Sequence, residues 1–148
     1  NKTIKRTIMK KLLLTIVAMV LFTGVELNAQ NSLSVNITGV KETKGQIYIA
    51  VFDASSFLKN GITGKIVSVN SKFMKVDFDN LPDGEYAIAL FHDINGNGKL
   101  DMKMNNLIGL PAEKYGFSNN AIPIMGAPDF ETCKFELKGN RTISIMLQ

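Results

Sequence analysis

Apolar and polar residues alternate along much of the chain from residue 30 onward. Leu33, Val35 and Ile37 alternate with polar side chains, which predicts a strand with one buried face. Similar patterns predict strands over residues 46–53, 65–70, 72–79, 85–91, 132–138 and 141–147. Residues 46–53 are apolar on both faces, so we expect that strand to lie in the middle of a sheet.

These seven segments predict an all-β fold, an antiparallel β-sandwich of about seven strands. No long helical pattern follows residue 29, and Gly139-Asn140 suits a two-residue hairpin turn between the last two strands. The predicted core includes apolar side chains from three of the strands: Met74, Val76, Phe78, Tyr86, Ile88, Leu90, Ile143 and Ile145.

Residues 102–129 are the least regular part of the chain. This stretch of 28 residues is rich in Gly, Pro and Asn, yet apolar residues occur throughout it. A disordered segment lacks such apolar anchors. We therefore expect one long, ordered loop excursion that folds over one end of the domain.

The first 29 residues have the order of a secretory signal peptide. Five basic residues precede an apolar run of 14 residues, and a short segment ending in Ala29 follows. A retained membrane anchor is the alternative, but a membrane-spanning helix needs about 20 apolar residues. We expect residues 1–29 to be removed and residues 30–148 to form one exported domain, periplasmic or extracellular, without membrane association.

Removal of that segment changes the charge of the chain. It holds five of the 17 Lys and Arg residues and one of the 13 Asp and Glu residues, so 12 of each remain and the formal net charge is zero. A neutral domain gives no support for nucleic-acid binding, which needs a basic patch. The only cysteine, Cys133, cannot form an internal disulfide, and we expect it to be a small buried side chain beside Phe135 and Leu137.

The strongest chemical signal directly follows the predicted strand 85–91. Oxygen side chains occupy three alternate positions, a Gly follows them, and an Asp comes three residues after that Gly. This is the D-x-[DN]-x-[DN]-G spacing of a calcium loop, in which the carbonyl after the Gly is a further ligand. The predicted calcium ligands are Asp93, Asn95, Asn97, the carbonyl of Lys99 and Asp101.

Two features separate this loop from an EF-hand. Its twelfth position is Met104, where an EF-hand has a bidentate Glu, and a strand rather than a helix precedes it. With only two charges the expected dissociation constant is about 10⁻⁴–10⁻³ M, unless Glu113, Asp129 or Glu131 supplies another carboxylate. The alternative is an Asn-Gly-rich turn whose side chains bond their own backbone.

The chain offers little for catalysis. His92 is the only histidine, and strand alternation directs it away from the face of Asp93. No nucleophile motif accompanies it, so we expect a structural role rather than a general base. Four residues suit contact with a sugar or peptide, or alternatively loop anchoring and turns: Tyr115, Phe117, Asn119 and Asn120.

Residues 89–101, 108–111 and 115–121 carry distinctive short motifs, and residues 126–131 read Gly-Ala-Pro-Asp-Phe-Glu. Together they resemble the DUF2141 family of exported bacterial proteins, with Ala127 in place of the first Pro of a Gly-Pro-Pro-x-Phe segment. The resemblance implies an immunoglobulin-like or transthyretin-like sandwich and brings no established activity. The turn at residues 81–86 is similar to one in transthyretin-like domains, and the signal ending resembles exported Bacteroidetes proteins.

Taken together, these features favour an exported, envelope-associated binding module over an enzyme. We expect a monomer with a calcium-type loop and an unknown protein or glycan partner. The alternative is a small hydrolase that works through the loop metal or through His92.

Overall fold

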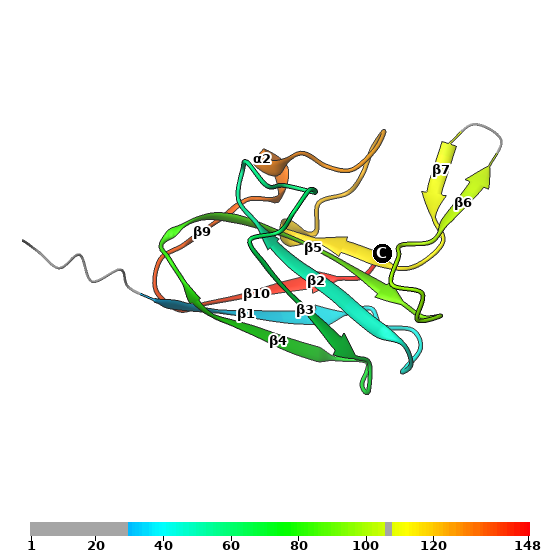
Figure 1. Ribbon diagram of the computed structural model, residues 1–148, viewed down its shortest axis with the longest axis horizontal. Coiled ribbons are helices and arrows are strands. Elements are labelled where there is room, and N and C mark those ends of the chain that lie inside the picture. The colour runs from blue at the N-terminus through cyan, green and yellow to red at the C-terminus, as the bar shows by residue number, and fades with distance from the viewer. Residues whose placement is uncertain (1–29, 106–107) are drawn as a thin grey trace, which may run out of the picture.

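The computed structural model describes residues 30–105 and 108–148 (Figure 1). The predicted signal segment, residues 1–29, lies outside the described residues. The strands are β1 (Asn31–Thr38), β2 (Gln46–Phe52), β3 (Thr63–Ser68), β4 (Met74–Leu81), β5 (Gly84–Asp93), β6 (Met102–Asn105), β7 (Ile108–Pro111), β8 (Tyr115–Phe117), β9 (Phe135–Leu137) and β10 (Arg141–Met146). Two short helical turns are η1 (Ser118–Asn120) and α2 (Phe130–Cys133).

Two sheets pack against each other and confirm the predicted β-sandwich. The smaller sheet has the order β10-β1-β4, and the larger has the order β3-β2-β5-β8, with β9 paired to the start of β5. In Figure 1 the strands β10, β1 and β4 run along the lower part of the molecule, β5 and β8 lie above them, and β2 and β3 slant from the upper to the lower side. The long strand β5 is central to the larger sheet, because it pairs with β2, β8 and β9. The predicted calcium loop begins where β5 ends.

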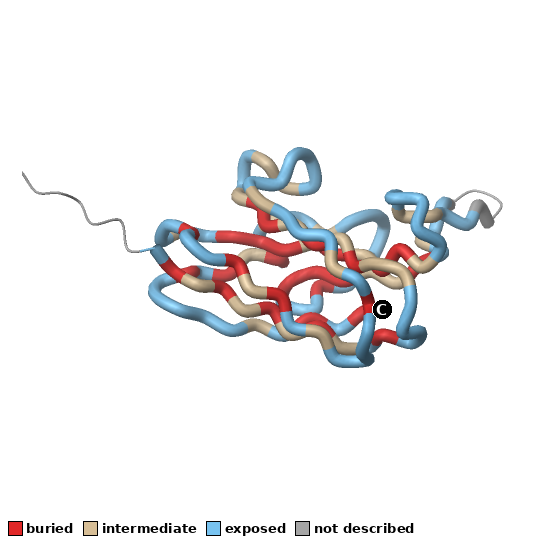
Figure 2. The backbone as a smooth tube through the Cα atoms, turned by 60° about the horizontal axis from the view of Figure 1, so that its bottom comes forward, coloured by how far each residue is buried: buried red, intermediate tan, exposed pale blue. Residues whose placement is uncertain are grey.

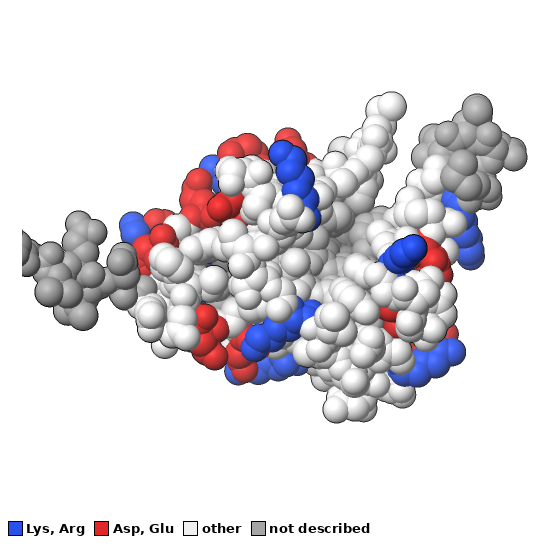
Figure 3. All heavy atoms as spheres, viewed as in Figure 1, with Lys and Arg blue, Asp and Glu red and all other residues white. Residues whose placement is uncertain are grey.

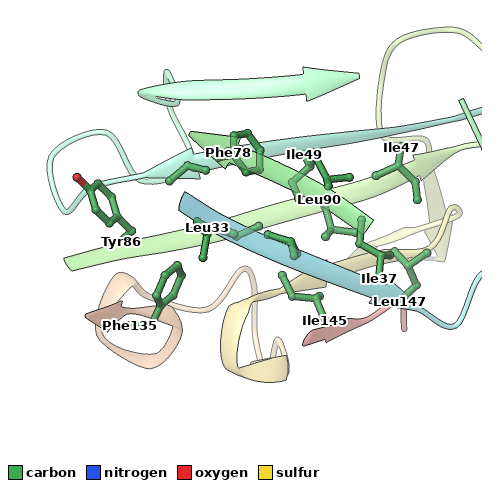
Figure 4. Packing of buried hydrophobic residues seen from close by; sticks show 14 of the residues in the cluster. Leu33, Ile37, Ile47, Ile49, Phe78, Tyr86, Leu90, Phe135, Ile145 and Leu147 are labelled. Carbon is green, nitrogen blue, oxygen red and sulfur yellow. The ribbon is translucent and has the colours of Figure 1, made fainter. Parts of the chain in front are cut away.

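The main core lies between the two sheets. Alternate residues of β1 are buried, as the period of two predicts (Figure 2). Leu33 and Ile37 from the smaller sheet pack towards Ile49 and Leu90 from the larger one (Figure 4). The predicted core residues are confirmed, because six of the eight are buried in this cluster and the other two, Met74 and Ile143, are partly buried against it.

A second, smaller core covers part of the outer face of the larger sheet. Ala87 on β5 and Phe117 on β8 are buried there together with Cys133 on α2, and the rings of Phe57 and Phe130 pack against them. This cover explains why β2 and β5 carry apolar residues on both faces. Burial raises the pKa of the Cys133 thiol to about 11, with a smaller contribution from the charge of Asp129.

The end of the chain differs from the prediction in two ways. Residues 132–138 do not form one strand, because Asp129 accepts a hydrogen bond from the backbone N–H of Thr132 and caps the helical turn α2 before β9 begins. The predicted hairpin at Gly139-Asn140 is also wrong. β9 pairs with β5, whereas β10 crosses to the other sheet and pairs with β1 in parallel.

Part of the predicted excursion forms further strands. The described residues therefore hold ten strands rather than about seven. β8 joins the larger sheet beside β5, and η1 contacts β10. The hairpin β6–β7 and the segment between η1 and α2 instead project from the sandwich (Figure 1). None of the described helices is long and apolar enough to cross a membrane.

Candidate metal loop

Asp93 is the organising residue of the predicted calcium loop. It is fully buried at the end of β5. Its Oδ1 accepts hydrogen bonds from the backbone N–H groups of Gly96 and Asn97, at 2.7 and 3.2 Å, and its Oδ2 accepts one from Gly98 at 2.8 Å. Gly96 and Gly98 have φ angles of +76° and +74°, which glycine adopts without steric cost. The loop therefore folds around the carboxylate of Asp93.

The side chains of Asn95, Asn97 and Asp101 meet on the exposed side of the same loop. The amide groups of Asn95 and Asn97 donate to the two carboxylate oxygens of Asp101, at 2.6 and 2.9 Å. Their own Oδ1 atoms accept from the backbone N–H groups of Asn97 and Lys99, at 3.1 and 2.8 Å. Three of the predicted ligands are thus brought together by direct contacts.

Glu113 is the one candidate for a further carboxylate that lies at the loop. It is buried, and its two oxygens accept hydrogen bonds from the backbone N–H groups of Ile94 and Asp101, at 2.9 and 3.2 Å. Asp129 caps α2, and Glu131 forms an ion pair with Lys134 at 2.9 Å. Those two carboxylates serve the helical turn α2 and not the loop.

The donor set of the loop consists of carboxylate, amide and carbonyl oxygens, which suit a hard cation such as Ca²⁺. Among the described residues, no three His, Cys, Asp or Glu side chains gather into a group that could hold a metal ion. An ion in the loop would therefore depend on the amide oxygens of Asn95 and Asn97 besides the carboxylates. The calcium site stays a prediction, and the hydrogen bonds also fit the alternative of a turn bonded to its own backbone.

His92 is fully buried on the core face of β5. Its Nε2 lies 2.7 Å from the backbone carbonyl of Lys44, which makes Nε2 the donor of that hydrogen bond. No hydrogen-bond partner for Nδ1 occurs in the part of the chain that the structure describes. The side chain joins the β1–β2 connection to the larger sheet, as a structural histidine would.

The residues around η1 that we predicted to contact a ligand mostly make contacts within the domain. Asn119 donates its side-chain amide to the carbonyls of Thr132 and Lys134, at 3.1 and 2.9 Å. The Oδ1 of Asn120 accepts from the backbone N–H of Met146 at 2.8 Å. Phe117 is buried and Tyr115 partly so, with their rings 6.0 Å apart. Ligand binding by these residues stays a prediction, and the contacts favour the anchoring alternative.

Ser118 is a structural residue that sequence reasoning missed. It is fully buried, its Oγ accepts from the backbone N–H of Ile88 at 2.9 Å, and it lies 2.6 Å from the carbonyl oxygen of Cys133, to which its hydroxyl donates. These two bonds join β5 to α2. A serine beside two asparagines carries no periodic signal, so only the neighbouring elements reveal its role.

An open cavity of about 610 Å³ lies at the other end of β5. Its lining includes Asp53, Asp79 and Glu85 around the apolar side chains of Leu81 and Tyr86. The pKa of Tyr86 is raised by burial and by the charges of Asp53 and Asp83. None of the predicted site residues lines this cavity, so the loop and the cavity are separate features.

A protein-family model described as "Uncharacterized protein conserved in bacteria (DUF2141)" matches residues 35–144 of the chain. The match includes the loop, η1 and every strand except the first residues of β1 and the last of β10. Neither the curated proteins nor the solved structures contain a significant match.

Proposed function

Because this chain belongs to the DUF2141 family, whose description names no activity, we propose its function from the geometry of the loop. It is an exported, non-enzymatic β-sandwich module that takes up calcium in the loop of residues 93–101. It binds a protein or glycan partner at the cell envelope, and calcium has a structural role in that module.

The convergence of Asn95, Asn97 and Asp101 is the observation that supports calcium uptake. Asp93 has already wound the backbone by three hydrogen bonds, so little further ordering is needed when an ion arrives. In the structure the two Asn amides donate hydrogen bonds to the carboxylate of Asp101. A cation would replace these amide donors and leave oxygen atoms as its ligands. With two loop carboxylates the expected affinity is weak, as in extracellular modules.

The burial of His92 favours the binding module over the alternative hydrolase. A general base has to come within hydrogen-bond reach of the proton that it removes. His92 is fully buried and uses Nε2 to hold the carbonyl of Lys44. A catalytic role would therefore require the end of the core to open.

A thermal melt with calcium and with a chelator tests the proposal. At a calcium concentration 100-fold above the dissociation constant, the native state gains about 2.7 kcal/mol. For a domain of this size the midpoint rises by about 10 °C. The Asp101→Asn variant keeps the size of the side chain but loses a charge, so we expect it to lose most of the shift.

The matched control is Asp79→Asn, which removes one exposed carboxylate on β4 and should keep the full calcium response. An unchanged wild-type melt in millimolar calcium would overturn the calcium role. So would an equal shift in the wild type and in Asp101→Asn.

A further inference from the structure

The segment between η1 and α2 exposes large apolar side chains. Residues 121–128, here named the apolar finger, read Ala-Ile-Pro-Ile-Met-Gly-Ala-Pro and contain no charged residue. Ile122 is 70% exposed, Ile124 92% and Met125 100%. Figure 3 shows the segment as an uncharged projection that stands clear of the sandwich. These three side chains contribute nothing to either core.

The base of the apolar finger is held by the fold. Asn119 lies just before it and donates to the carbonyls of Thr132 and Lys134 just after it. Ser118 donates to the carbonyl of Cys133 in the same place. These contacts close the two ends of the finger against each other, so its apolar tip is presented from an anchored base.

The exposed apolar side chains of the finger indicate a contact with another molecule. Scattered single apolar residues on a surface are ordinary, but a contiguous apolar patch marks a contact with another molecule. From the tip of this finger, three large side chains in four consecutive residues project into solvent. Their burial would remove apolar surface from water, which is favourable in proportion to the area covered.

We propose that the apolar finger inserts into the surface of a lipid bilayer. A stable protein–protein interface takes about 20–30 residues from each side, whereas the finger has eight and none of them is Trp, Tyr or Arg, the residues that dominate such interfaces. A bilayer needs no surface of complementary shape, and the strength of shallow, reversible insertion scales with the apolar area that is buried. The small, convex and aliphatic tip fits this second kind of partner.

The charges around the finger indicate the kind of lipid surface. The finger has no Lys or Arg. Asp129 and Glu131 follow at its base, where Lys134 forms ion pairs with Glu131 and Glu85, so the carboxylates there outnumber the single ammonium group. An anionic surface would repel these carboxylates, so the expected partner is a zwitterionic headgroup layer. Backbone groups of residues 122–128 have no backbone hydrogen bonds to the described part of the chain, so they have to stay at headgroup depth, where water reaches them.

This contact with lipid rests on the proposed envelope location and adds a surface to it. It differs from membrane spanning, and it departs from our expectation, made from the sequence, that the exported domain does not associate with a membrane. The calcium loop lies on other residues, so the two proposals can fail separately.

Co-sedimentation with phosphatidylcholine vesicles tests the insertion. We expect the wild type to sediment with the vesicles, and the double variant Ile124→Asp, Met125→Asp to lose at least tenfold in the ratio of bound to free protein. Both side chains are almost fully exposed, so the melting midpoint of this variant should not change. The matched control is Phe73→Asp, which removes an apolar side chain that is 76% exposed before β4 and should bind as the wild type does.

Several outcomes would overturn the insertion: no wild-type binding to phosphatidylcholine, an equal loss in Phe73→Asp, or binding only to vesicles that contain phosphatidylglycerol. Sedimentation velocity without lipid supplies another, because a wild-type dimer that the double variant abolishes would make the finger an interface between copies. The calcium-dependent melt of the double variant, and vesicle binding by Asp101→Asn, separate failure of the insertion from failure of the calcium role.

Discussion

Glu113 accepts a hydrogen bond of 2.9 Å from the backbone N–H of Ile94, 19 positions earlier in the chain. The other oxygen of the same carboxylate accepts from the backbone N–H of Asp101 at 3.2 Å. One buried side chain therefore holds both ends of the candidate calcium loop. This carboxylate fixes the entry and the exit of the loop.

Replacement of Glu113 should destabilise the domain measurably. Glu113→Ala leaves two backbone N–H groups without their acceptor in a partly buried place, and each unsatisfied buried donor costs about 1–3 kcal/mol. We expect a loss of about 2–4 kcal/mol in urea-induced unfolding. The control Glu136→Ala removes an exposed carboxylate with a surface ion pair to Lys138, so it should cost under about 1 kcal/mol. Equal costs for both variants would contradict the role of Glu113.

Asn119 should act through stability and not through ligand contact. It has a φ angle of +59° and its amide holds two carbonyls beyond the finger. Asn119→Ala loses both bonds and strains the backbone, whereas Asn119→Gly loses only the bonds. We expect Asn119→Ala to be the less stable by about 1 kcal/mol, with both below the wild type, in chemical unfolding. Wild-type stability in both variants would contradict this structural role.

The thiol of Cys133 gives a pH dependence with a definite sign. Burial raises its pKa from 9.0 in the unfolded chain to about 11 in the folded one. The folded state therefore favours the protonated thiol, and this contribution to stability is complete below pH 9 and is lost as the pH rises from 9 to 11. Cys133→Ala should remove that part of the slope while lowering stability at pH 7, where the smaller side chain leaves a cavity. Unfolding curves at pH 7, 9 and 10.5 check both effects, and an unchanged slope would contradict them.

The alternation of apolar residues predicted which faces of the strands are buried but not which strands are neighbours. Ile145 was placed in the core because period two depends only on the pleat of its own strand. The parallel pairing of Val35 with Ile143 depends on a crossover between sheets, which no local pattern encodes. The apolar alternation at residues 132–138 predicts a strand that includes Cys133, but the cap at Asp129 starts a helical turn that takes in this residue.

For the candidate site, too, the sequence predicted local features but not contacts between distant residues. The spacing of oxygen side chains identified Asp101 and its two Asn neighbours, because ligand spacing is a local property of a loop. The spacing did not indicate that Asp93 would turn inward to its own backbone. It also did not indicate that Asn119 would serve the base of the apolar finger, because its acceptors lie 13 and 15 positions away.

Substitutions of the two loop carboxylates should differ in their effect on the stability of the domain. Asp93 is fully buried and accepts three backbone N–H groups, whereas the side chain of Asp101 meets only two amides on the exposed side of the loop. Asp93→Ala should therefore cost about 2–4 kcal/mol even in the presence of a chelator, since it removes the charged acceptor that three backbone N–H groups share. Asp101→Asn should cost under about 1 kcal/mol in chelator, because a substitution at a partly exposed position away from the core has a small effect.

In the presence of calcium, Asp101→Asn is the more informative of the two variants. Asp101→Asn keeps a folded loop, so a missing calcium response in that variant reports the loss of a ligand charge alone. Asp93→Ala combines a lost ligand with a loosened loop, and its melt cannot separate the two. Titration calorimetry of Asp101→Asn against calcium at pH 7 is therefore the decisive measurement. Wild-type affinity in that variant would exclude Asp101 as a calcium ligand and leave it as a partner of the two Asn amides.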